Sequence, residues 1–172
     1  MTTPIDIALA AEIVTTGTAS GKMVVIAESC TGGMVVAALT DISGASAVLD
    51  RGLVTYSNDA KSSLLGVAGT TLASHGAVSP ETAAEMAAGA LAAAPQSHVA
   101  VAITGIAGPG GGSLEKPLGL VWFGLAVRGG AIETCRHLFE GNRAAIRVQA
   151  ANEALRLLLG GLSLKTGLRS RR

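Results

Sequence analysis

The chain is 172 residues long, which is enough for one domain with a substantial hydrophobic core. Hydrophobic residues make up 49% of the sequence but aromatic residues only 2%, so the core must be aliphatic and its elements can pack closely. The net charge of +1 excludes a strongly basic or acidic protein. Short, interrupted apolar runs predict no membrane span, and the N-terminus lacks the basic region of a signal peptide.

Helical and strand patterns alternate along the chain. In chain order, they predict a helix over 4–18, a strand over 22–29, a helix over 31–43, a strand over 50–57, helical segments over 58–66 and 70–76, a helix over 80–94, strands over 97–105, 118–127 and 131–139, and a helix over 142–159.

Local signals support several of these boundaries. Ser79-Pro80-Glu81 combines a capping side chain with proline at the first helical position, and Gly129-Gly130 indicates a hairpin. The continuously apolar strand 97–105 is typical of a sheet covered on both faces. Together the elements predict an α/β fold, a three-layer α/β/α sandwich with a mixed, mostly parallel sheet.

Two features bear on the environment and organisation of the protein. Cys30 and Cys135, in a chain without a secretion signal, are typical of reduced thiols in a cytoplasmic protein. The last ten residues, "SLKTGLRSRR", hold four basic residues and no acidic one. Because neither a basic stripe nor an aromatic platform accompanies them, we do not expect nucleic acid as a partner. We predict one domain over residues 1–160 and a basic, flexible tail over 161–172.

Polar segments follow three of the predicted strands, at the ends where ligands bind in open α/β sheets. These segments are residues 28–31, residues 56–58 with the nearby Lys61, and residues 104–113. Helical crossovers favour parallel strands, so the three ends should meet at one edge of the sheet. The sequence therefore predicts a site at that edge.

The first segment belongs to "AESCTGG", residues 27–33, and allows two interpretations. Gly32 and Gly33 at the start of a helix could present backbone N–H groups to an anion or an oxyanion. Ser29 at a strand-to-helix turn is similar to a nucleophile elbow, but the G-x-S-x-G and S-x-x-K patterns are both absent. The residues alone leave open a capped, glycine-rich turn or a nucleophile loop.

A hydroxyl nucleophile needs a base. His75, His98 and His137 occupy positions typical of structural or exposed side chains, which disfavours a Ser-His-Asp arrangement. Lys61 is the better candidate, because burial beside apolar residues can lower the pKa of a lysine towards neutrality. Tyr56, the only tyrosine, could orient this lysine or donate a proton. A solvated lysine and a core tyrosine are the alternatives.

Two further motifs could bind a phosphate. The loop "TGIAGPGGGS", residues 104–113, has five glycines whose N–H groups suit an anion, but it is neither a P-loop nor a dinucleotide fingerprint. Arg143 and Arg147 lie on one face of the last helix, where they could grip a phosphate or form a solvated face. Because no Cys/His/Asp cluster has metal-ligand spacing, we expect no metal.

Taken together, the chain resembles the CinA C-terminal domain family, whose stand-alone members include nicotinamide mononucleotide deamidases. The matching stretches are "AESCTGG", "RGLVTYSNDAK", "HGAVSPETA", "TGIAGPGGGSLEKPLGLVWF" and "GNRAAIRVQA", in the family's order between residues 24 and 159. The resemblance implies hydrolysis of the nicotinamide carboxamide of the mononucleotide, giving nicotinic acid mononucleotide and ammonia. It also implies a homodimeric, cytoplasmic enzyme of pyridine nucleotide salvage that needs no cofactor. Larger members carry an additional N-terminal domain, which we do not expect in this chain.

The resemblance also implies roles for individual residues. Ser29 would be the nucleophile and Lys61 the base, with Tyr56 beside them. The residues that we expect to bind the substrate are Glu28, Thr31, Gly32, Gly33, Asn58, Thr104, Gly105, Ala107, Gly108 and Arg143, the last of them at the phosphate. The loop has Gly110 where many members have an acidic residue.

The mechanism leaves alternatives open. Ser29 could form an acyl-enzyme, or Ser29 and Lys61 could activate water directly. Cys30 could attack instead of Ser29 if a helix N-terminus lowered the pKa of its thiol. A non-catalytic nucleotide-binding module of the competence-associated kind would use the same loops without turnover.

Overall fold

A five-stranded mixed sheet forms the middle layer of the computed structural model, which describes residues 4–164. The strands are β1 (Met23–Glu28), β2 (Leu49–Val54), β3 (Ser97–Gly105), β4 (Leu120–Val127) and β5 (Ile132–Leu138), arranged in the order β2-β1-β3-β4-β5. β1 pairs in parallel with β2 and β3, whereas β4 is antiparallel to β3 and β5. The predicted mixed sheet is confirmed, but the prediction that it is mostly parallel is wrong, because two pairings are parallel and two are antiparallel. A glycine-rich loop and a hairpin, rather than helices, join the antiparallel strands.

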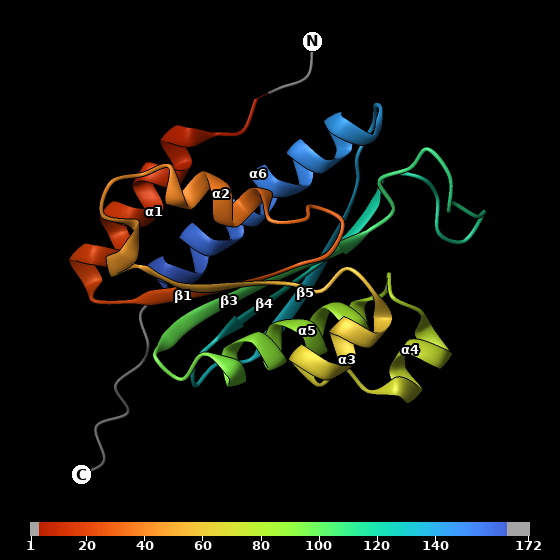
Figure 1. Cartoon of the computed structure of the whole chain (residues 1–172), viewed down its shortest axis with the longest axis horizontal. Helices are drawn as coiled ribbons and strands as arrows, with labels where there is room; N and C mark the ends of the chain where they lie inside the picture. Colours follow the sequence, from red (N-terminus) through yellow and green to blue (C-terminus); the bar gives the residue numbers. More distant parts are fainter. Residues whose placement is uncertain (1–3, 165–172) are drawn as a thin grey trace.

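Helices cover both faces of the sheet, which confirms the predicted three-layer sandwich (Figure 1). They are α1 (Ile7–Ser20), α2 (Met34–Thr40), α3 (Asn58–Leu65), α4 (Gly69–His75), α5 (Pro80–Ala93) and α6 (Arg143–Ser163), with a short 3-10 helix at Ala45–Ala47. α1, α2 and α6 lie on one face, and α3, α4 and α5 on the other (Figure 1). Within residues 4–164, no helix has the length and apolarity needed to cross a membrane.

The last helix is longer than predicted. It begins at Arg143, where the Asn142 side chain accepts a hydrogen bond from the Ala145 N–H at 3.0 Å, and it continues to Ser163. Gly161 and Leu162 are buried, because this end of the helix packs back onto the sheet. This helix therefore includes residues 161–163 of the predicted tail, and residues 165–172 lie outside the described part of the chain.

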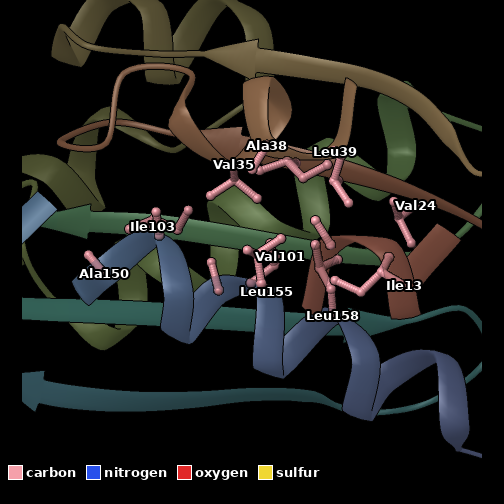
Figure 2. Packing of buried hydrophobic residues seen from close by; sticks show 14 of the residues in the cluster. Ile13, Val24, Val35, Ala38, Leu39, Val101, Ile103, Ala150, Leu155 and Leu158 are labelled. Atoms are coloured by element: carbon pink, nitrogen blue, oxygen red, sulfur yellow. The ribbon is translucent and has the colours of Figure 1, made fainter. Parts of the chain in front are cut away.

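Two aliphatic clusters fill the space between the layers, as the composition predicts. Figure 2 shows the larger one, where Ile13, Leu39, Val101 and Leu155 meet between the sheet and the helices α1, α2 and α6. The smaller one lies between the sheet and α5. At Gly89 in α5, an added Cβ would overlap the backbone carbonyl of Leu65. Small residues thus let α5 lie directly against α3, which positions the loops at the sheet edge.

Candidate active site

The stretch that links β1 to α2 forms a tight turn carrying Ser29. The Ser29 N–H donates to the Ile103 carbonyl of β3 at 3.0 Å, and the Gly32 N–H donates back to the Ser29 carbonyl at 3.1 Å. Gly32 and Gly33 have φ values of 61° and 100°, in the left-handed region that favours glycine. The two glycines therefore give the backbone the shape that returns it from β1 into α2.

Glu28 fixes this turn from the inside. Its carboxylate is fully buried and accepts hydrogen bonds from the N–H groups of Gly33, Val35 and Val36, at 2.9, 3.3 and 3.0 Å. A carboxylate at a helix N-terminus satisfies donors that would otherwise be unpaired and interacts favourably with the helix dipole. The prediction that the N–H groups at the start of α2 bind an anion or an oxyanion of the substrate is wrong, because the Glu28 carboxylate already accepts their hydrogen bonds.

Arg147 holds the same turn from α6. Its Nε donates to the Cys30 carbonyl at 3.0 Å and its Nη2 to the Thr31 carbonyl at 2.9 Å. Thr31 is buried, and its hydroxyl has no hydrogen-bond partner within residues 4–164. The sequence left Arg147, together with Arg143, as either a phosphate ligand or part of a solvated face, but its guanidinium instead contacts the backbone of the Ser29 turn.

Lys61 contacts Ser29 from α3, on the other side of the sheet edge. Its side chain is only 1% exposed, and its Nζ lies 3.0 Å from the Ser29 Oγ. The same Nζ donates to the carbonyls of Thr55 and Tyr56, at 2.9 and 3.3 Å. Burial lowers the pKa of Lys61 below its ordinary value of 10.5, although the nearby Cys30 opposes this shift. A neutral amine held by two carbonyls has its lone pair free to accept the Ser29 proton.

A cavity of about 220 Å³ opens above this pair. Its lining residues are Ser29, Cys30, Tyr56, Lys61, Ala77, Val78, Thr104, Gly105, Ala107 and Arg143. The structure thus brings together residues from the ends of β1, β2 and β3 and from the start of α6, as the strand-end argument predicts. Ala77 and Val78 are additions that the sequence reasoning missed, because apolar loop residues carry no chemical signal. The Thr104 hydroxyl, donating to the Ala77 carbonyl at 2.6 Å, holds that loop against β3.

Arg143 and Tyr56 form the rim of the cavity. The Arg143 guanidinium donates to the Tyr56 hydroxyl at 3.0 Å and to the Gly108 carbonyl at 2.7 Å. Tyr56 is 61% exposed, so it is not a core ring, and its backbone carbonyl rather than its hydroxyl contacts Lys61. The positively charged Arg143 guanidinium therefore lies at the mouth of the cavity, between the end of β2 and the glycine-rich loop.

Several predicted site residues do not line the cavity. They are Glu28, Thr31, Gly32, Gly33, Asn58 and Gly108. Glu28, Gly32 and Gly33 shape the turn, and Gly108 receives the Arg143 hydrogen bond. Asn58 is an exposed residue at the start of α3, a helix that Ser57 rather than Asn58 caps.

Cys30 lines the cavity but has the properties of a neutral thiol. Its side chain is 6% exposed, and burial raises its pKa to about 11. Because a thiolate is the nucleophilic form of cysteine, this environment disfavours attack by Cys30 near neutral pH. Cys30 and Cys135 are both free cysteines.

The histidines lie away from the cavity. His98 accepts a hydrogen bond from the Met23 N–H, while His75 and His137 lie beside Glu81 and Glu153. Among residues 4–164, no three His, Cys, Asp or Glu side chains are grouped closely enough to hold a metal ion.

Comparison with known proteins places this geometry in a family. Residues 6–162 match the family model described as the CinA C-terminal domain. The chain belongs to the CinA C-terminal domain family. Among its relatives, the nicotinamide-nucleotide amidohydrolase PncC of Enterobacter agglomerans is 54% identical over 141 residues, which cover 82% of this chain and 85% of that protein. The PncC protein of Escherichia coli (strain K12) is 54% identical over 140 residues, covering 81% and 84% of the two chains.

A solved structure of the same family supports the fold. The competence/damage inducible protein CihA from Agrobacterium tumefaciens superposes with a TM-score of 0.88 at 47% identity, covering 94% of this chain and 99% of the other. A longer family member from Caldicellulosiruptor bescii, named a putative competence-damage inducible protein, is 49% identical over 133 residues. Those residues are 77% of this chain but 32% of that protein. Members of the family thus carry both enzymatic and competence-related names.

Proposed function

We propose that this chain is a nicotinamide-nucleotide amidohydrolase. It hydrolyses nicotinamide mononucleotide to nicotinic acid mononucleotide and ammonia, as a cytoplasmic enzyme of pyridine nucleotide salvage. The observation that carries the proposal is the contact between the Ser29 hydroxyl and the buried Lys61 amine, 3.0 Å apart in a cavity. The 54% identity to proteins named for this activity supports the choice of substrate.

The reaction begins with proton transfer. Neutral Lys61 accepts the Ser29 proton while the Ser29 Oγ adds to the carboxamide carbon, giving a tetrahedral oxyanion. Lys61 then gives its proton to the leaving nitrogen, and ammonia departs. Lys61 next takes a proton from a water molecule, whose oxygen adds to the acyl carbon. As the bond from that carbon to the Ser29 Oγ breaks, Lys61 returns the proton to Ser29, and the carboxylic acid product ionises to the carboxylate. Since Glu28 occupies the donors at the start of α2, we assign oxyanion stabilisation to backbone N–H groups on the cavity wall near Gly105.

The cavity dimensions favour a particular placement of the substrate. A volume of about 220 Å³ is smaller than the roughly 300–1,000 Å³ typical of drug-sized ligands, so it suits the nicotinamide ring better than the whole nucleotide. The phosphate then lies at the rim, where the Arg143 guanidinium can bind it bidentately beside Tyr56. Thr104, Gly105 and Ala107 form the walls around the ring.

A direct attack by water is the alternative to the acyl-enzyme, with Ser29 and Lys61 orienting and deprotonating that water. Intact-mass spectrometry of the protein quenched during turnover distinguishes the two routes. An acyl-enzyme adds the mass of the nicotinoyl nucleotide to the chain, and this adduct is absent in Ser29→Ala.

The second candidate function is a nucleotide-binding module without turnover, which the competence-related names of relatives favour. The deciding experiment incubates the purified protein with nicotinamide mononucleotide and measures ammonia, with Lys61→Ala as the control. A hydrolase releases ammonia continuously and far above the control. Binding of the nucleotide in calorimetry, with no more ammonia than from the control, would overturn the proposed activity.

A further inference from the structure

Strand β5 is an open edge of the sheet. It is the last strand in the order, and six of its seven residues, Ile132–Leu138, are exposed. Two of them are large apolar residues, Ile132 at 45% and Leu138 at 61% exposure. Natural sheets often block such an edge with charged side chains, a proline or a bulge. β5 contains the charged residues Glu133 and Arg136 but no proline, and its pairing with β4 runs without a bulge.

The backbone of β5 directs alternate residues towards the open side. The Phe139 N–H, one residue past the strand, donates to the Gly119 carbonyl at 2.9 Å, so odd-numbered positions bond to β4. The even-numbered residues Ile132, Thr134, Arg136 and Leu138 therefore present their N–H and C=O groups outward. Within residues 4–164, no other strand pairs with them.

The sequence of β5, "IETCRHL", is complementary to itself when it is reversed about Cys135. In an antiparallel pair of two β5 strands centred there, Ile132 lies opposite Leu138, Glu133 opposite His137, and Thr134 opposite Arg136. Apolar residues then face apolar ones, and an acidic residue faces an imidazole. A pair centred on Arg136 would instead oppose two like charges, which is destabilising.

This register also agrees with the direction of the hydrogen bonds and the two faces of the sheet. The opposed Thr134 and Arg136 are both outward-directed, so they exchange both of their backbone hydrogen bonds. Arg136 stacks over Trp122 on the face covered by α5, whereas His137 contacts Glu153 of α6 on the other face. The apolar and charged pairs consequently form on opposite faces of the shared sheet.

We propose that a second copy of this chain docks antiparallel on β5, so that one continuous sheet runs through both copies with the two-fold axis at Cys135. This surface uses none of the residues that line the active-site cavity, so the proposal is independent of the proposed function. It supplies an interface for the homodimer that the family resemblance implies.

The first test measures the mass of the full chain by sedimentation equilibrium. Wild type is expected at twice the chain mass of 17.0 kDa. Thr134→Pro removes an outward N–H that β4 does not use, so it should fold with an unchanged circular dichroism spectrum and sediment as a monomer. Thr134→Val keeps that N–H and should remain dimeric. A monomeric wild type, or a Thr134→Pro protein that is still dimeric, would overturn the proposal.

The second test reads the register directly and does not depend on a proline. In a non-hydrogen-bonded pair, the two Cys135 Cα atoms lie about 4.5 Å apart, within the range that a disulfide spans. Mild oxidation should therefore cross-link wild type and Cys30→Ala into a covalent dimer, but not Cys135→Ser. Moving the thiol by one position, in Thr134→Cys/Cys135→Ser, should abolish the cross-link. Equal cross-linking of this shifted variant would contradict the register.

Discussion

Replacing Lys61 by methionine should separate activity from stability, because the lysine is buried at a position where an apolar side chain of similar length would fit. Among residues 4–164, the Lys61 Nζ is the only group hydrogen-bonded to the Ser29 Oγ, at 3.0 Å. General bases contribute about 10²- to 10⁴-fold to rates, equivalent to roughly 3–5 kcal/mol of barrier. We therefore expect kcat/KM for ammonia release to fall by about that factor in Lys61→Met.

The effect on stability depends on pH, and its sign follows from the lowered pKa. Between the folded pKa and 10.5, the unfolded chain holds a proton on Lys61 that the folded chain has released. Wild type therefore loses stability as the pH falls through this window, and the loss is complete and constant below the folded pKa. Each tenfold difference in proton affinity corresponds to about 1.4 kcal/mol. Methionine does not titrate, so Lys61→Met does not undergo this loss. The free energy of unfolding of the variant minus that of wild type should therefore increase as the pH falls through the window.

Urea unfolding of both proteins at a series of pH values measures this difference. The lost hydrogen bonds to the Thr55 and Tyr56 carbonyls add a constant cost to the variant, so the informative quantity is the change of the difference with pH. The control is Lys116→Met, which replaces a lysine outside the active-site cavity. Parallel stability curves for wild type and Lys61→Met would refute the conclusion that burial lowers the pKa of Lys61.

Two further substitutions test the turn and the rim. Glu28→Gln replaces a buried carboxylate that accepts three backbone hydrogen bonds, so we expect urea unfolding to show a loss of about 1–3 kcal/mol, while the exposed Glu133→Gln changes stability little. If Glu28→Gln had the same free energy of unfolding as wild type, the hydrogen bonds from Glu28 to the start of α2 would not contribute to stability. Arg143→Met should raise KM for nicotinamide mononucleotide by roughly 10- to 100-fold but leave turnover of nicotinamide riboside, which has no phosphate, nearly unchanged. Arg156→Met on the exposed side of α6 is its control, and equal losses on both substrates would argue against a phosphate contact.

The elements that the sequence predicted well are those with local signals. Ser79 and Asn142 cap α5 and α6 through hydrogen bonds to residues three positions ahead, and Gly129-Gly130 forms the predicted hairpin. The convergence of three strand ends was also predictable, because the helical crossovers between β1, β2 and β3 make these strands parallel.

The remaining features depend on contacts between distant residues. The polar helix around Lys61 does not by itself distinguish a buried lysine from a solvated one. Lys61 is only 1% exposed because it packs against the end of β1 and the turn. The role of Arg147 depends on carbonyls more than a hundred positions away. The anion site predicted at Gly33 failed for a different reason: spacing alone does not tell whether the neighbouring Glu28 carboxylate folds back onto the helix.

The most direct measurement of the central claim compares ammonia release from nicotinamide mononucleotide by wild type, Ser29→Ala and Cys30→Ala at equal concentrations. We expect wild type to release ammonia and nicotinic acid mononucleotide in equal amounts. Cys30→Ala should retain activity within a few-fold, because its thiol is neutral, whereas Ser29→Ala should lose nearly all of it. Full activity in Ser29→Ala, or its loss in a correctly folded Cys30→Ala, would contradict the assignment of Ser29 as the nucleophile.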